Sequence, residues 1–157
     1  MKVLVAYATT HGSTAEIAEF MGGVLKERDL DVTVARVGQI QSVQGYDAFV
    51  LGSPIYGGMW LTEMSQFLEK FSAELASKPV YFWIACIRVL EPDGLKAAQT
   101  EYVYKPMLEK AGVKEVSVFA VKLTLDVIDW NERWTLSARY DGKELPGKHN
   151  NDYRHWN

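Results

Sequence analysis

Five runs of apolar residues recur along this chain of 157 residues, and they constrain its fold more than any other feature. Most of the runs are continuously apolar, a pattern typical of strands buried on both faces of a parallel sheet. Helical patterns stand between them, and strands that alternate with helices predict a doubly wound α/β fold in one domain, residues 1–157. The runs are Val3–Ala8, Val32–Val37, Ala48–Gly52, Val80–Ile87 and Val116–Leu123.

Three segments between the runs have apolar residues at helical spacing. The third, around Ala97 to Lys110, holds Pro106, which is expected to start, kink or split a helix. Gly22 and Gly23 lower the stability of the first helix, and close packing on the sheet is the expected reason. The apolar faces of the first and second helices comprise Ile17, Phe20, Met21, Val24 and Leu25, and Met64, Phe67, Leu68, Phe71 and Leu75.

The first run passes directly into a polar loop, and a helix follows from Ala15. Backbone N–H groups at a helix N-terminus have no partner within the helix and carry about +0.5 of dipolar charge, so an anion is stabilised there. Because the loop holds hydroxyl groups but no Lys or Arg, it suits the phosphate of a resident cofactor better than a phosphoryl group in transfer. The loop comprises Thr9, Thr10, His11, Gly12, Ser13 and Thr14.

A helix cap is the alternative interpretation of this loop. Ser13 and Glu16 have the spacing of a capping box, in which side chains satisfy the first N–H groups of the helix. Such a cap needs no ligand.

The third run leads into a second loop, whose composition suits a flat heteroaromatic ring. Ligands of doubly wound folds bind outside the carboxyl ends of the strands, where the strand order reverses. Tyr56 or Trp60 would stack on the ring, and the glycines expose backbone groups that hydrogen-bond its edge. Alternatively, the aromatic residues pack in the core and the glycines only form a turn. The loop comprises Ser53, Pro54, Ile55, Tyr56, Gly57 and Gly58.

The fourth run ends in a third loop at the same predicted edge, with Ala85, Cys86, Ile87 and Arg88. Arg88 would either neutralise the negative charge of a reduced ring or be a solvated surface residue. Cys86 is expected to be a small buried residue and not a nucleophile, because no His lies near it in the sequence.

Composition excludes several partners and compartments. A net charge of −3 gives no basic surface for nucleic acid and no polybasic membrane signal. No apolar run approaches the ~20 residues of a membrane span, so none is expected. The single cysteine fits a reducing compartment, and a cytoplasmic location is expected.

Missing residues exclude other chemistries. A phosphoacceptor receiver needs acidic residues after the first strand and an Asp at the end of the third, where this chain has Ala8, Thr9 and Ser53. A low-molecular-weight tyrosine phosphatase needs an Arg six positions after its Cys, where this chain has Pro92. The three histidines are scattered without ligand spacing, so no metal site is expected.

The first two loops together resemble those of the flavodoxin-like superfamily, most closely flavodoxin-domain proteins related to menaquinone-dependent protoporphyrinogen oxidase. The resemblance extends from Met1 to about Leu123 and implies a three-layer fold with a five-stranded parallel sheet in the order 2-1-3-4-5. It implies FMN, with the phosphate on residues 9–14 and the isoalloxazine ring between the second and third loops. Residues 53–58 would then line one side of the ring, and residues 85–88 would approach its pyrimidine end.

The resemblance also implies a function. The chain would be an FMN-dependent oxidoreductase linked to a quinone or an organic substrate, without a catalytic side chain because the flavin does the chemistry. Residues 129–133 resemble the segment that follows the fifth strand in that branch, and Trp130 and Trp134 are expected to wall a substrate site. One alternative is an electron carrier for a redox partner protein. Another is a module that binds no flavin.

The last residues depart from the family pattern. Residues 151–156 resemble the start of the family's final helix, but the sequence stops at Asn157. One face of the sheet is therefore expected to lack its cover, which would expose apolar surface and favour a homodimer or another partner. A truncated terminus is the alternative. Asp141-Gly142 is expected to close a hairpin or to end a helix.

Overall fold

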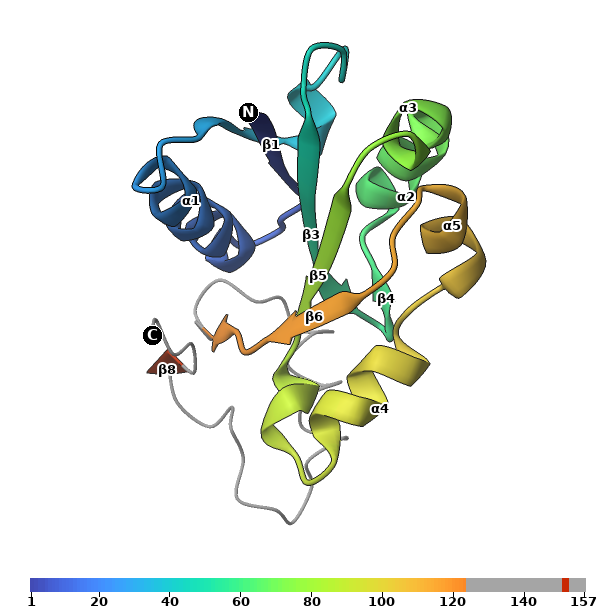
Figure 1. Cartoon of the computed structure of the whole chain (residues 1–157). Helices are drawn as coiled ribbons and strands as arrows, with labels where there is room; N and C mark the ends of the chain where they lie inside the picture. Colours follow the sequence, from blue (N-terminus) through green and yellow to red (C-terminus); the bar gives the residue numbers. More distant parts are fainter. Residues whose placement is uncertain (124–150, 153–157) are drawn as a thin grey trace.

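A sheet of parallel strands in the order β2-β1-β3-β5-β6 forms the centre of the computed structural model, which describes residues 1–123 and 151–152 (Figure 1). A short strand, β4 (Met59–Trp60), pairs antiparallel with the end of β3. Without this hairpin strand, the order is the predicted 2-1-3-4-5, and the predicted fold class is confirmed. The parallel strands are β1 (Lys2–Tyr7), β2 (Asp31–Arg36), β3 (Ala48–Tyr56), β5 (Val80–Ala85) and β6 (Val116–Phe119).

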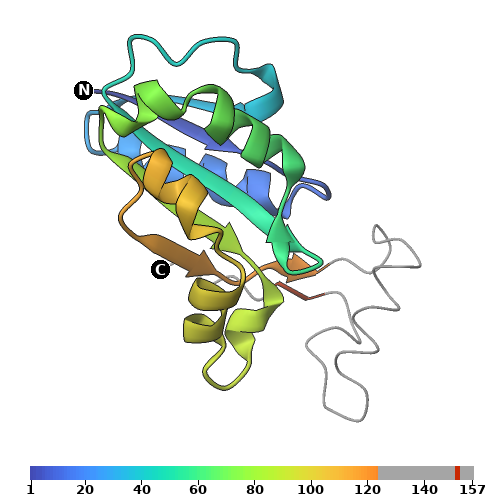
Figure 2. The ribbon, with the colours of Figure 1, turned by 90° about the vertical axis from the view of Figure 1, so that its right-hand side faces the viewer.

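Helices cover both faces of this sheet, as the views in Figures 1 and 2 show. One face carries α1 (Ser13–Lys26). The other carries α2 (Thr62–Lys70), α3 (Ser72–Ala76), α4 (Gly94–Glu101) and α5 (Lys105–Lys110). Pro106 lies in the first turn of α5, so the third predicted helix is split as expected. The second predicted helix is divided at Phe71, between α2 and α3.

Helix α1 packs closely on the sheet at Gly22. A Cβ atom at this position would lie 2.4 Å from Cγ2 of Val34 on β2, which is shorter than any real contact. A Cβ at Gly23 would meet nothing within 4 Å. Close packing on the sheet therefore explains the glycine at position 22, as predicted, but not the glycine at position 23.

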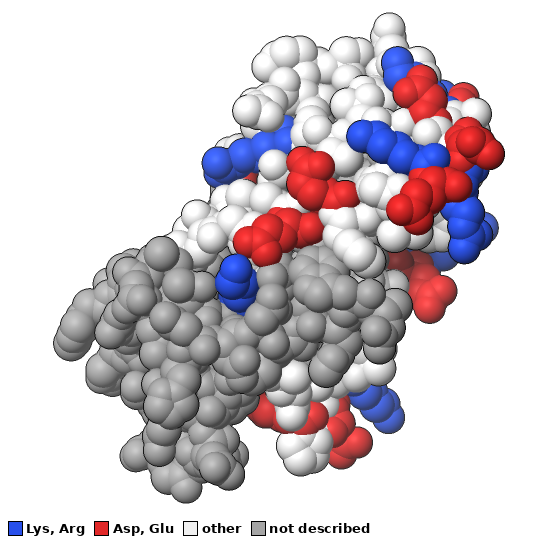
Figure 3. Space-filling model, turned by 90° about the vertical axis from the view of Figure 1, so that its left-hand side faces the viewer, with Lys and Arg blue, Asp and Glu red and all other residues white. Residues whose placement is uncertain are grey.

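An apolar groove of about 550 Å³ lies beside α1 on its face of the sheet. Val24 on α1, Tyr81 on β5 and Phe119 on β6 line it, and all three side chains are exposed. On the side of the molecule that carries α1, acidic and basic side chains are interspersed (Figure 3). Apolar side chains are thus exposed on this face among the described residues, whereas the expected lack of a cover and its replacement by a second copy stay predictions.

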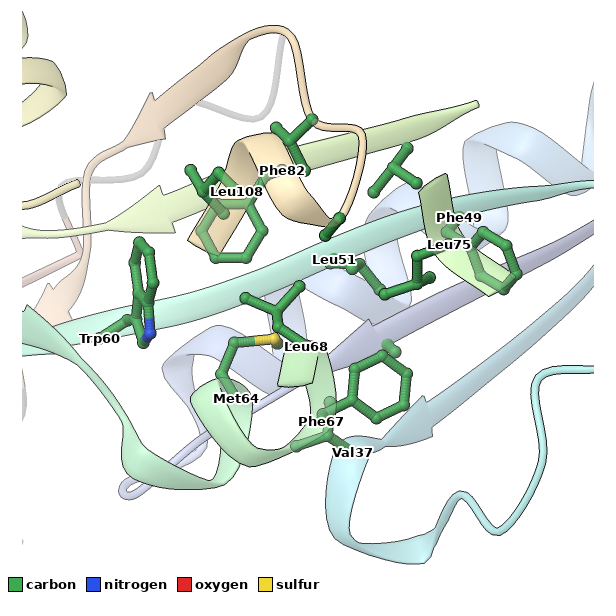
Figure 4. Close-up of a cluster of buried hydrophobic side chains, with 14 of the residues drawn as sticks. Val37, Phe49, Leu51, Trp60, Met64, Phe67, Leu68, Leu75, Phe82 and Leu108 are labelled. Carbon is green, nitrogen blue, oxygen red and sulfur yellow. The ribbon is translucent and has the colours of Figure 1, made fainter. Parts of the chain in front are cut away.

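The opposite face of the sheet holds the larger buried cluster (Figure 4). Helices α2, α3 and α5 pack there against β3 and β5. All five residues of the predicted apolar face of the second helix are buried in it. The cluster includes Phe49, Leu51, Trp60, Met64, Phe67, Leu68, Leu75, Phe82 and Leu108.

The last described strands differ from the prediction. The fifth predicted run divides into β6 and β7 (Lys122–Leu123), and β7 pairs antiparallel with β8 (Asn151–Asp152). The expected helix start at Asn151 is therefore wrong for these two residues, because they pair with β7 as a strand. The predictions for Trp130, Trp134, Asp141-Gly142 and residues 153–156 lie outside the described residues. No helix in the described part is long and apolar enough to cross a membrane.

Candidate functional site

The three predicted loops leave the same edge of the sheet, at the carboxyl ends of β1, β3 and β5. Parallel pairing sets them side by side, since Tyr7 lies opposite Gly52 and Pro54 lies opposite Ala85. The rings of His11 in the first loop and Tyr56 in the second approach to 6.0 Å between centroids. Residues 45 positions apart in the sequence thus meet where doubly wound folds bind ligands.

The N-terminus of α1 has the backbone geometry of an anion site. Gly12 occupies the N-cap position with a left-handed φ of 88°, and it has no side chain that could cap the helix. The helical hydrogen-bond ladder begins with the Glu16 N–H, which donates to the Gly12 carbonyl at 3.1 Å. The N–H groups of residues 13–15 therefore lie outside the ladder, at the positive end of the helix dipole. This arrangement is the one that binds phosphate in many proteins.

Ser13 is the first residue of α1 and not its cap, so the capping-box alternative is wrong. Its hydroxyl oxygen instead accepts the backbone N–H of Lys122 on β7 at 3.0 Å. The side chain of Thr14 is buried, and Thr10 is exposed on the loop.

A network of hydrogen bonds shapes the first loop from outside. The Thr9 hydroxyl accepts the N–H of Gly12 at 3.0 Å and closes the turn. The Thr9 N–H donates to the Glu63 carboxylate at 3.3 Å, and that carboxylate also pairs with Arg36 at 3.1 Å. Arg36 ends β2 and Glu63 lies in α2, so both join the candidate site although neither lies in one of the three predicted loops. No sequence pattern could have found them, because only the sheet order brings β2 and α2 together beside this loop.

A cation also lies at the start of α1, although the loop itself contains none. The Lys122 ammonium is 3.7 Å from the Glu16 carboxylate, and both side chains are partly exposed. The prediction that only neutral donors serve an anion here is thus incomplete, because β7 brings a lysine to the first turn from more than a hundred residues away.

The second loop forms a tight hairpin. Strand β3 continues through Tyr56, and β4 begins at Met59. Gly57 and Gly58 have positive φ angles of 59° and 82°, which a two-residue type I′ turn requires at both central positions. The turn leaves Tyr56 half-buried and Gly57 exposed at the edge of the sheet.

Two polar or aromatic residues of this segment have structural roles. The Ser53 hydroxyl is fully buried, accepts the Leu61 N–H at 3.0 Å and donates to the Pro54 carbonyl at 3.0 Å. Trp60 is buried in the core, donates from its indole N–H to the Ser65 hydroxyl at 2.7 Å and packs edge-on against Phe82. Of the two stacking candidates, only Tyr56 lies at the edge.

The third loop is more enclosed than the sequence predicts. Ala85 and Cys86 are buried, and the Cys86 N–H donates to the Phe119 carbonyl at 3.0 Å, so Cys86 is the small buried residue expected. Ile87 and Arg88 are half-buried in the 3₁₀ turn η2 (Ile87–Leu90).

Arg88 has carboxylate partners on both sides. Its guanidinium pairs with Glu91 and lies 3.9 Å from the Glu101 carboxylate. The Nε atom is buried and meets no hydrogen-bond acceptor in the described part of the chain. Arg88 is thus neither a fully solvated residue nor an uncompensated positive charge.

These features fit a flavin with a phosphate. The start of α1 would offer N–H donors and a nearby cation to the phosphate, and Tyr56 would offer an aromatic face beside exposed backbone. In the third loop, the buried Arg88 Nε meets no acceptor among the described residues, and it would lie at the pyrimidine end that the resemblance implies. The donor set is therefore compatible with this cofactor.

A sheet in this order, with an open helix N-terminus on the first loop and an aromatic hairpin on the second, defines the flavodoxin-like class of α/β proteins. The chain belongs to the flavodoxin domain family, whose model matches residues 4–146. Membership of this family implies a flavin cofactor.

Individual relatives agree with this assignment. The chain is 26% identical over 161 residues to protoporphyrinogen IX dehydrogenase (quinone) of Escherichia coli strain K12, covering 99% of this chain and 89% of that protein. Flavodoxin 2 of Bacillus cereus superposes with a TM-score of 0.61 at 24% identity, covering 77% and 85% of the two chains. An archaeal flavodoxin superposes with a TM-score of 0.60 at 19% identity, covering 80% and 87%. The two solved structures are similar to this chain in fold.

Proposed function

We propose that this chain binds FMN at the carboxyl edge of the sheet and acts as an FMN-dependent oxidoreductase. The observation that carries the proposal is the convergence of the α1 N-terminus with the His11–Tyr56 ring pair at one edge. Residues 9–14 would hold the phosphate, Tyr56, Gly57 and Gly58 would lie against the ring, and residues 85–88 would approach its pyrimidine end.

When bound, the flavin supplies reversible transfer of electrons or hydride. The residues of the chain bind it, orient it and set the charge around it. The stiff hairpin fixes Tyr56 relative to the first loop, and the contact of Glu63 with the Thr9 N–H fixes the loop itself. Charge in the third loop is set by Arg88 together with two carboxylates, so this loop adds no net positive charge beside a reduced ring.

We further propose that a quinone accepts the electrons. The name of the Escherichia coli relative includes a quinone, and its similarity extends over nearly the whole of this chain. An electron carrier for a redox partner protein is the second candidate. The exposed hairpin tip supports it, because Gly57 and Met59, which is 63% exposed, would offer a docking surface next to the ring.

The first experiment is an absorbance spectrum of the purified protein, followed by titration of the stripped protein with FMN. Flavin bands and one-to-one binding are expected, and steady-state reduction of a soluble quinone should follow. Flavin binding without quinone turnover, but with rapid electron delivery to a redox protein, would favour the carrier. A colourless protein that FMN does not bind would refute the proposal and leave a non-redox module.

A further inference from the structure

Lys122 lies against the first turn of α1 through two separate contacts. Its backbone N–H donates to the Ser13 hydroxyl oxygen at 3.0 Å, and its ammonium is 3.7 Å from the Glu16 carboxylate. Both partners belong to the first four residues of α1. The backbone contact fixes the start of the lysine side chain at the point where the helix presents its N–H groups.

The lysine is held weakly at its present partner. The Lys122 side chain is 42% exposed and that of Glu16 is 51% exposed, and ion pairs this exposed contribute little to stability. The four-carbon stem is flexible, so the ammonium can exchange one anion for another nearby without moving the backbone. A phosphate monoester carries close to two negative charges at neutral pH and is a stronger partner than one carboxylate.

Lys122 also changes the charge around the α1 N-terminus. Glu16 is the acidic residue of the first turn, and its carboxylate would repel a bound phosphate. Lys122 lies 3.7 Å from that carboxylate and offsets part of its charge when no ligand is bound. With a ligand, it supplies the positive charge that residues 9–14 lack.

We infer that Lys122 is a phosphate-recognition residue, which leaves Glu16 and pairs with the phosphate of the flavin. The inference rests on the proposed binding of FMN and adds a determinant of ligand choice. Lys122 would make the site select the phosphorylated flavin over riboflavin, which has the same ring and no phosphate. Binding of FMN would then weaken as salt rises, whereas binding of riboflavin would not.

The test measures dissociation constants of FMN and riboflavin for the stripped protein by quenching of flavin fluorescence, at low and high salt. In Lys122→Met, which keeps an unbranched side chain without the charge, the Kd for FMN at low salt should rise about fivefold, the equivalent of about 1 kcal/mol. The Kd for riboflavin should stay within about twofold of the wild-type value, within the context dependence of such contacts. Lys122→Arg should retain the affinity for FMN, and Lys110→Met, an exposed lysine on α5, is the matched control.

The outcomes separate this inference from the function on which it rests. Wild-type protein that binds neither flavin refutes the proposed function. Wild-type protein that prefers FMN, together with a Lys122→Met variant that keeps both the affinity and its salt dependence, refutes the role of Lys122 alone. Equal loss of FMN and riboflavin binding in Lys122→Met also refutes it, because the lysine would then only support the structure. If Lys122→Met does not fold, Lys122→Gln replaces it. Loss of the preference for FMN over riboflavin in folded Lys122→Gln would support the role of Lys122, and an unchanged preference would refute it.

Discussion

The Ser53 hydroxyl offers the sharpest test of how the second loop is built. The sequence places Ser53 among the residues that would line the flavin ring, whereas in the structure its hydroxyl is fully buried and bonded within the hairpin. We predict that Ser53→Ala destabilises the protein even when no cofactor is bound. The hydroxyl is expected to hold the return of the chain after β4, where Leu61 leads into α2.

The expected magnitude follows from the two bonds that are lost. The Leu61 N–H loses its acceptor at 3.0 Å, and a donor left unsatisfied in the interior costs about 1–3 kcal/mol. The Pro54 carbonyl loses a donor at 3.0 Å, and a typical bond of this kind contributes about 1 kcal/mol. Some relaxation is expected because Leu61 is only half-buried, so the free energy of unfolding should fall by about 2 kcal/mol. This corresponds to a decrease of about 4–8 °C in the melting temperature for a chain of this size.

The assay is urea unfolding of the stripped protein, followed by tryptophan fluorescence and circular dichroism. Ser42→Ala is the matched control, because the Ser42 hydroxyl also accepts a backbone N–H, that of Gln44, but at the surface. The control should change the free energy of unfolding by less than about 0.5 kcal/mol. Stability of stripped Ser53→Ala equal to wild type, together with a tenfold or greater loss of FMN affinity, would refute the reasoning. The hydroxyl would then act on the cofactor and not on the hairpin.

Three further predictions concern other parts of the molecule. Gly22→Ala should lower the free energy of unfolding by about 1–3 kcal/mol, because the added Cβ overlaps the sheet. Gly23→Ala should raise that free energy by about 0.5–1 kcal/mol, because its Cβ meets no other atom and alanine favours the helix. Urea unfolding of the two variants measures both changes. Thr10→Ala combined with Thr14→Ala should raise the Kd for FMN at least about tenfold by removing hydrogen bonds to a charged group, and an unchanged Kd would contradict the assignment of this loop to the phosphate. Glu91→Gln should raise the flavin reduction potential by about 20 mV, because the positive charge of Arg88 is then no longer neutralised by the Glu91 carboxylate. No shift in a redox titration would mean that the third loop does not influence the ring.

The fold could be predicted because its determinants are local. Continuous apolar runs identify the parallel strands, and apolar residues at helical spacing identify the helices between them. Pro106 divides the third helical segment for a reason that acts within one turn. The break at Phe71 was missed, since the apolar spacing of the second segment continues across it from α2 into α3.

The candidate site could be predicted only in part, because loop composition does not show which polar groups form hydrogen bonds within the protein. Ser53 and Trp60 have side chains that could contact a ligand. In the structure, both side chains form hydrogen bonds within the protein instead, Ser53 with the Leu61 N–H and Trp60 with the Ser65 hydroxyl. The spacing of Ser13 and Glu16 fits a capping box, yet Gly12 takes the cap position and β7 takes the Ser13 hydroxyl. These outcomes depend on partners distant in the sequence, which local patterns do not contain.

Ion pairs at the carboxyl edge bring cations to the three loops, which neither the net charge nor the loop sequences indicate. Arg36 pairs with Glu63 beside the first loop, Lys122 with Glu16 at the start of α1, and Arg88 with two carboxylates at the third loop. Each cation therefore stands next to a loop of the proposed site, and each is compensated in the absence of a ligand. Because the exposed ion pairs contribute little to the stability of the fold, an anionic ligand can replace the carboxylate partner of a cation with little loss of folding free energy. Ionic strength should consequently alter the affinity of this edge for a phosphorylated ligand much more than it alters the stability of the sheet beneath it.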